Sequence, residues 1–101
     1  MDINKLMEQA QAMQTKMEKA AKEIQEGEYE GSASNGLVKV IIDGNNKIKN
    51  ISIDSTIINK EDKEILEDLV MIAVNDATSK LESIRQEKIS QSTGGIKLPG
   101  M

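Results

Sequence analysis

The chain contains no cysteine, histidine, tryptophan or phenylalanine, and Tyr29 is its only aromatic residue. Without cysteine there is neither a disulfide framework nor a thiolate metal site. Without histidine there is no Ser-His-Asp triad and no imidazole metal ligand. With a single ring there is also no platform on which unpaired bases stack. These absences exclude most enzyme classes and the common readers of single-stranded nucleic acid.

Long apolar runs are missing too. No stretch of about 18 apolar residues exists, so no membrane span is expected. The start, Met1-Asp2-Ile3-Asn4, lacks the basic and apolar parts of a signal peptide. Gly94-Gly95-Ile96-Lys97 does not match a phosphate-binding loop, because no strand precedes it and no helix follows it. We therefore expect a cytoplasmic protein that is not an enzyme and has no cofactor, no metal and no small-molecule substrate.

The 101 residues amount to one domain, which we place at residues 1–89. Fourteen of them are isoleucine, a residue that favours half-buried sheets. A chain of this size has only a modest core. Because no large rings fill that core, and a strand face or edge is expected to stay open, we expect a homodimer.

Residues 2–26 show the period of an amphipathic helix. The apolar positions recur at alternating spacings of three and four, which is a heptad pattern; they are Ile3, Leu6, Ala10, Met13, Met17, Ala20 and Ile24. Gly27 is expected to end this helix in the left-handed conformation.

Residues 28–53 predict a three-stranded antiparallel meander. Asn35-Gly36 is a hairpin signal, and Asp43-Gly44-Asn45-Asn46 is the next turn. Between these turns Val38, Val40 and Ile42 share one face of a strand. Residues 47–53 form the third strand, and the more polar segment 28–34 is expected at an edge.

A second long helix is expected to begin at Asn59, with Asp62 completing a capping box, and to end near Ile89. Its first half is apolar over a wide arc, as in a helix that packs on a sheet, and its second half narrows to a stripe. At about 1.5 Å per residue the helix is longer than a three-stranded sheet, so its far end is expected to project. Residues 90–101 are expected to be a flexible tail rich in glycine and serine.

The formal charge of −4 is unevenly distributed. Residues 54–89 carry the whole excess of acid, chiefly at residues 61–68. After Asp76 the bases outnumber the acids, and Lys80, Arg85 and Lys88 fall within about 140° of the helix surface. On the first helix Lys5, Lys16 and Lys19 lie on the polar face. The same charges are also explained without a binding role, because charged side chains at these spacings keep a helix soluble and form i,i+4 pairs.

Several segments, taken in order, resemble the YbaB/EbfC nucleoid-associated proteins. The first is Gln9-Ala10-Gln11-Ala12-Met13-Gln14-Thr15-Lys16-Met17, and the second is Gly36-Leu37-Val38-Lys39-Val40 followed by Asp43-Gly44. Others are Ile53-Asp54, Leu66-Glu67-Asp68-Leu69-Val70, Ala73-Val74-Asn75-Asp76-Ala77 and the tail Leu98-Pro99-Gly100-Met101. The chain departs from many relatives at Ser55, where they carry proline, and in lacking their glycine-rich start.

This resemblance implies a bacterial DNA-binding homodimer with the sheets at its centre and helix ends that project to grip a duplex. No short motif of the family marks a DNA-reading residue, so the site is predicted from charge alone. The predicted phosphate-binding residues are Lys5, Lys16, Lys19, Lys80, Arg85 and Lys88. The alternative is a protein-interaction module that acts with replication or recombination proteins. In it, the heptad positions of the first helix and the narrow apolar stripe of the second pair with a helix of the partner, and any effect on DNA is indirect.

Overall fold

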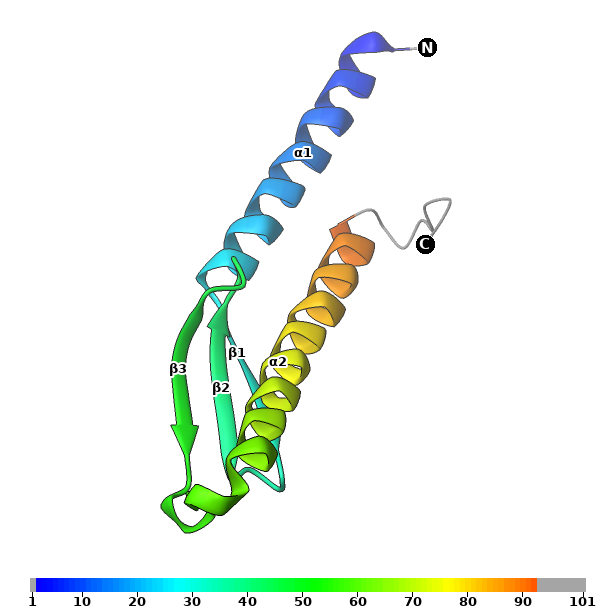
Figure 1. The fold of residues 1–101 in the computed structure, drawn as a ribbon. Helices are drawn as coiled ribbons and strands as arrows, with labels where there is room; N and C mark the ends of the chain where they lie inside the picture. Colours follow the sequence, from blue (N-terminus) through cyan, green and yellow to red (C-terminus); the bar gives the residue numbers. More distant parts are fainter. Residues whose placement is uncertain (1, 93–101) are drawn as a thin grey trace.

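The computed structural model describes residues 2–92, and it confirms an α+β fold in which a meander separates two long helices. Helix α1 (Ile3–Glu26) is followed by strands β1 (Glu28–Ala33), β2 (Val38–Asp43) and β3 (Ile48–Ile53), and then by α2 (Lys63–Ser92). The strands pair antiparallel in the order β1-β2-β3. In Figure 1 α2 lies along the sheet, whereas α1 extends away from it, and the molecule is 71 Å long.

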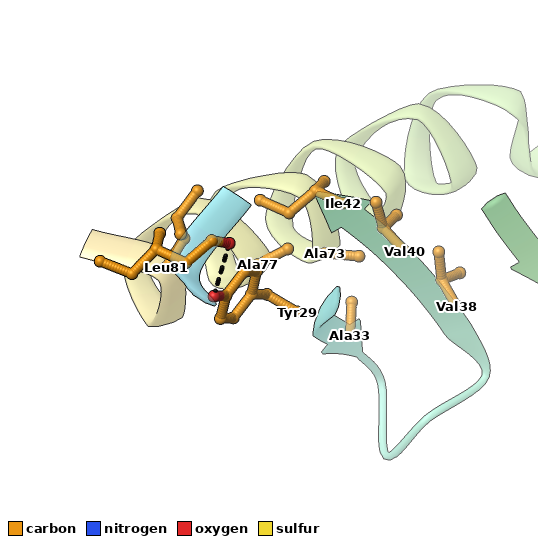
Figure 2. Packing of buried hydrophobic residues seen from close by; sticks show 9 residues of the cluster. Tyr29, Ala33, Val38, Val40, Ile42, Ala73, Ala77 and Leu81 are labelled. Atoms are coloured by element: carbon orange, nitrogen blue, oxygen red, sulfur yellow. Dashed lines mark hydrogen bonds between the residues drawn. The ribbon is translucent and has the colours of Figure 1, made fainter. Parts of the chain in front are cut away.

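The core lies between the central strand β2 and the middle of α2. Val38, Val40 and Ile42 alternate along β2 and are fully buried, as the sequence predicts for one face of a strand. They face a row of helix residues that are also fully buried: Ala73, Ala77 and Leu81 (Figure 2). The two alanines let the helix backbone lie close to the strands.

Close approach of α2 also explains Gly31 on β1. This residue pairs with Val40, and a Cβ built on it would collide with the backbone of Ala73 and Ala77. Its φ angle is not positive, so space rather than backbone conformation requires glycine here.

The C-terminal end of α1 (residues 23–26), which we call its root, is held in place by Tyr29, the single aromatic residue. The Tyr29 hydroxyl donates a 2.9 Å hydrogen bond to the carbonyl oxygen of Ile24, the one buried residue of α1 (Figure 2). Gly27 ends the helix as predicted, but in an extended conformation (φ −77°, ψ 165°), so the predicted left-handed cap is wrong. A Cβ at Gly27 would lie 2.6 Å from the Tyr29 hydroxyl oxygen, so a larger residue would displace the ring that bonds to Ile24.

The start and end of the second helix differ from the prediction. Asn59 makes no side-chain capping bond; it precedes a 3₁₀ turn (Lys60–Asp62), and α2 begins only at Lys63. The expected capping box is therefore absent. At the other end α2 continues to Ser92, three residues past the predicted end, and residues 93–101 of the predicted tail lie outside the described part of the chain.

The two edges of the sheet differ. On β1, the Ser32 N–H donates to the Asp76 carboxylate at 2.9 Å, and the Glu30 carbonyl accepts from the Lys80 ammonium at 3.0 Å. Side chains of α2 thus form hydrogen bonds with backbone groups of β1 that would otherwise be open at that edge. On β3, which forms the other edge, Ile48 and Ile51 are about half exposed. Within the described residues, β3 is the edge strand with large exposed apolar side chains.

Candidate nucleic-acid interface

The first part of α1 is an exposed basic surface, which we call the α1 arm (residues 3–22). It contains four lysines and two glutamates, so it is positively charged in a chain of net charge −4. Lys5, Lys16 and Lys19 are exposed and lie within roughly 60° of the helix surface, at about 100° per residue. This lysine row is about 21 Å long, at roughly 1.5 Å per residue.

The lysine row is also free to meet a ligand. Among residues 2–92, no acidic side chain lies within ion-pair distance of the Lys5, Lys16 or Lys19 ammonium. The apolar stripe of α1, represented by Leu6, Met13 and Met17, lies about a third of a turn away. A partner that covers the stripe therefore leaves the lysine row open to solvent.

Lys80, by contrast, is engaged within the chain. Its ammonium donates to the Glu30 carbonyl and forms an ion pair with Asp76 at 3.3 Å. The Ser32 N–H and then the Lys80 ammonium hold the pKa of Asp76 below its usual value, because both stabilise the carboxylate. These contacts give Lys80 a structural role at the edge of β1.

Arg85 is engaged in a similar way. Its guanidinium donates a 2.6 Å hydrogen bond to the Gly44 carbonyl and lies 3.8 Å from a Glu82 carboxylate oxygen. Gly44 is itself pressed against α1, since a Cβ there would collide with the backbone of Ile24 and Gln25. Arg85 therefore holds the β2–β3 turn between the two helices.

Lys88 bonds to α1 itself. Its ammonium lies 2.8 Å from the Glu23 carboxylate, in a pair whose side chains are 34% and 48% exposed. Each partner stabilises the charged form of the other, so the pKa of Glu23 is lowered and that of Lys88 is raised. Lys19 also lowers the pKa of Glu23 through its charge, to a smaller extent.

The six predicted residues thus form two groups rather than one site. Lys5, Lys16 and Lys19 lie on the α1 arm, and the helix that projects farthest is α1 (Figure 1). The far end of α2 extends past the sheet as expected (Figure 1), but Lys80, Arg85 and Lys88 bond to β1, the β2–β3 turn and α1. Glu23 was missed, and no local pattern points to it because its partner is 65 residues away.

Comparison with known proteins agrees with this architecture. Residues 1–96 match the model of the YbaB/EbfC DNA-binding family. The chain belongs to the YbaB/EbfC DNA-binding family. A nucleoid-associated protein of Rickettsia akari (strain Hartford) is 40% identical over 98 residues, covering 97% of this chain and 92% of the relative. The same identity and coverage hold for a nucleoid-associated protein of Rickettsia conorii (strain ATCC VR-613 / Malish 7).

A crystal structure shares the fold of this YbaB/EbfC member. An uncharacterised protein from Helicobacter pylori superposes with a TM-score of 0.73 at 22% identity, over 93% of this chain and 99% of that one. The family is one of DNA-binding proteins rather than of enzymes. Within the described residues, neither helix has a stretch long and apolar enough to cross a bilayer.

Proposed function

We propose that this YbaB/EbfC member binds duplex DNA as a homodimer in the cytoplasm, on the nucleoid, mainly through phosphates and with little sequence preference. The observation that carries the proposal is the lysine row of the α1 arm: Lys5, Lys16 and Lys19 are exposed, aligned and without acidic partners among residues 2–92. Aligned cations on a projecting helix attract the phosphate backbone and displace its counterions.

Low sequence preference follows from the kind of side chain in the row. Lysine presents a single ammonium, which neutralises phosphate without reading a base edge as a bidentate arginine or asparagine does. The α1 arm contains no arginine, and its one asparagine, Asn4, lies in the first helical turn. Contacts of this kind position a protein on DNA and do not select a sequence.

The homodimer is supported by apolar surface that one chain leaves uncovered. Ile51 pairs with Val40, so its side chain lies on the face of the sheet that α2 covers at β1 and β2, yet it is 43% exposed. Ile48 at the same edge is 50% exposed, and Leu6 and Met13 on α1 are also exposed. A second copy placed along β3 would bury the isoleucines and leave both α1 arms outside.

The dimer has a direct test. We expect sedimentation equilibrium at micromolar concentration to give twice the chain mass, and Ile51→Lys to raise the dimer dissociation constant at least about tenfold. Two buried isoleucines, each worth about 1.5–3 kcal/mol, are lost per dimer. Asn50→Lys is the matched control, since it adds the same charge to the opposite face of β3. A monomeric wild-type protein would overturn the proposed dimer.

DNA binding itself is tested by fluorescence anisotropy with a labelled duplex over a salt series. With about four phosphates engaged, the logarithm of the association constant should fall with the logarithm of salt concentration at a slope of roughly −3.6. Two duplexes of equal length and different sequence should bind within a few fold of each other. Affinity that does not change with salt would contradict binding through phosphates.

The protein-interaction module remains the alternative because the apolar stripe of α1 is exposed at Ile3, Leu6, Met13 and Met17. In that case the stripe binds a helix of a replication or recombination protein, and DNA effects are indirect. Purified protein that shifts no duplex at low salt, yet co-purifies with such a partner, would favour this function over the first.

A further inference from the structure

Lys88 stands at the end of the lysine row although it comes from the other helix. Glu23 follows Lys5 by 18 residues, which is five full turns, so it lies in line with Lys5 and Lys16 on α1. The Lys88 ammonium is 2.8 Å from the Glu23 carboxylate. The row of positive charge along α1 is thus continued by Lys88, but that charge is already paired.

We propose that Glu23 is an autoinhibitory residue of the DNA site: its carboxylate occupies the Lys88 ammonium in the free protein, and a DNA phosphate displaces it. This inference rests on the proposed DNA binding and adds a means of regulating it. Phosphate and carboxylate offer a lysine the same kind of charge-assisted hydrogen bond. The two acceptors therefore compete for one ammonium, and the intramolecular carboxylate reduces the affinity of the protein for DNA.

The surroundings of the pair favour exchange over a permanent bond. Both side chains are partly exposed, so their ion pair is weak in water and a phosphate has access to it. Lys19 lies one turn from Glu23 and acts on the same carboxylate. When a phosphate replaces Glu23 as the partner of Lys88, the link between the root of α1 and the end of α2 is also released.

The test compares Glu23→Gln with Glu18→Gln in the anisotropy assay. Both changes remove one negative charge from α1, but the Glu18 carboxylate accepts only a weak 3.4 Å hydrogen bond from Gln14 and has no ion-pair partner among residues 2–92. Glu23→Gln should bind duplex about two- to fivefold more tightly than Glu18→Gln, the range set by a partly exposed ion pair. Its salt slope should steepen by about 0.9 for each Lys88 that reaches a phosphate.

A Lys88→Gln background makes the test specific, and circular dichroism confirms that each variant is folded. In that background Glu23→Gln should bind duplex no more tightly than Glu18→Gln, because the Lys88 ammonium, for which Glu23 and phosphate compete, is absent. If wild-type protein binds DNA and Glu23→Gln only equals Glu18→Gln, or binds more weakly, the autoinhibition is overturned while DNA binding stands. If neither wild type nor Glu23→Gln binds at low salt, both proposals fall.

Discussion

Reversing the lysine row, with Lys5→Glu, Lys16→Glu and Lys19→Glu in one protein, should weaken duplex binding at low salt by at least about 100-fold. Each phosphate contact is worth on the order of 1 kcal/mol at a separation of about 4 Å in water. Three lost contacts, about 3 kcal/mol in all, already correspond to a loss of roughly 100-fold, and the new carboxylates add repulsion. Anisotropy at 50 mM salt measures the effect, and the salt slope should become shallower.

The control reverses three other exposed lysines, Lys39, Lys60 and Lys63, of which Lys63 forms an exposed ion pair with Glu67 at 3.3 Å. They lie on β2, the 3₁₀ turn Lys60–Asp62 and the start of α2, at the end of the sheet opposite the α1 arm (Figure 1). This variant has the same net charge, so a general electrostatic effect would weaken both proteins equally. Equal losses in the two variants would contradict a site on the α1 arm.

Reversal of Lys80, Arg85 and Lys88 is less informative, although the sequence placed these residues in the site. Their bonds reach the carbonyls of Glu30 and Gly44 and the Glu23 carboxylate. Reversal would thus disturb the edge of β1, the β2–β3 turn and the root of α1 together. The assignment of Lys80 and Arg85 to DNA stays a prediction.

The largest effect on stability is expected from Gly31→Ala. A strand glycine replaced by alanine ordinarily gains about 0.5–1 kcal/mol. Here the new Cβ would collide with the backbone of Ala73 and Ala77, and backbone atoms do not move aside as a side chain does. We therefore expect the opposite sign, a loss of about 3 kcal/mol or more, as in severe overpacking of a core.

Urea denaturation at a fixed protein concentration measures this loss, since the stability of a dimer depends on concentration. Glu30→Ala is the control, because it changes the neighbouring exposed side chain on the other face of β1. Its midpoint should stay close to that of wild type. A Gly31→Ala protein as stable as wild type would mean that α2 does not lie as close to β1 as the structure places it.

The regular elements could be predicted because their signals are local. The alternation of Val38, Val40 and Ile42 identifies the buried face of β2, since side chains of a strand point to opposite faces in turn. The three-four spacing of α1 identifies a helix with one apolar side. The capping box predicted at Asn59 is wrong, because a 3₁₀ turn (Lys60–Asp62) follows Asn59 and α2 begins only at Lys63.

The candidate site was only partly predictable, because sequence signals are local and the contacts of a side chain are not. A helical wheel gives the direction of each side chain but not what lies opposite it. Lys5, Lys16 and Lys19 point to solvent from a helix that contacts the body only at its root, so their predicted exposure is correct. Lys88 carries the same charge as these lysines and also lies on a helix, but its partner, Glu23, is set by where α2 meets α1.

By itself, the sequence determined the order of helices and strands, the YbaB/EbfC membership and the positive charge of the α1 arm in an acidic chain. These follow from spacings of a few residues and from composition. Only the tertiary structure decided which cations remain available, because the partners of Lys80, Arg85 and Lys88 lie 50, 41 and 65 residues away. Such pairs form when packing of the core sets the angle and distance between α2, the sheet and α1, and no local pattern records that geometry.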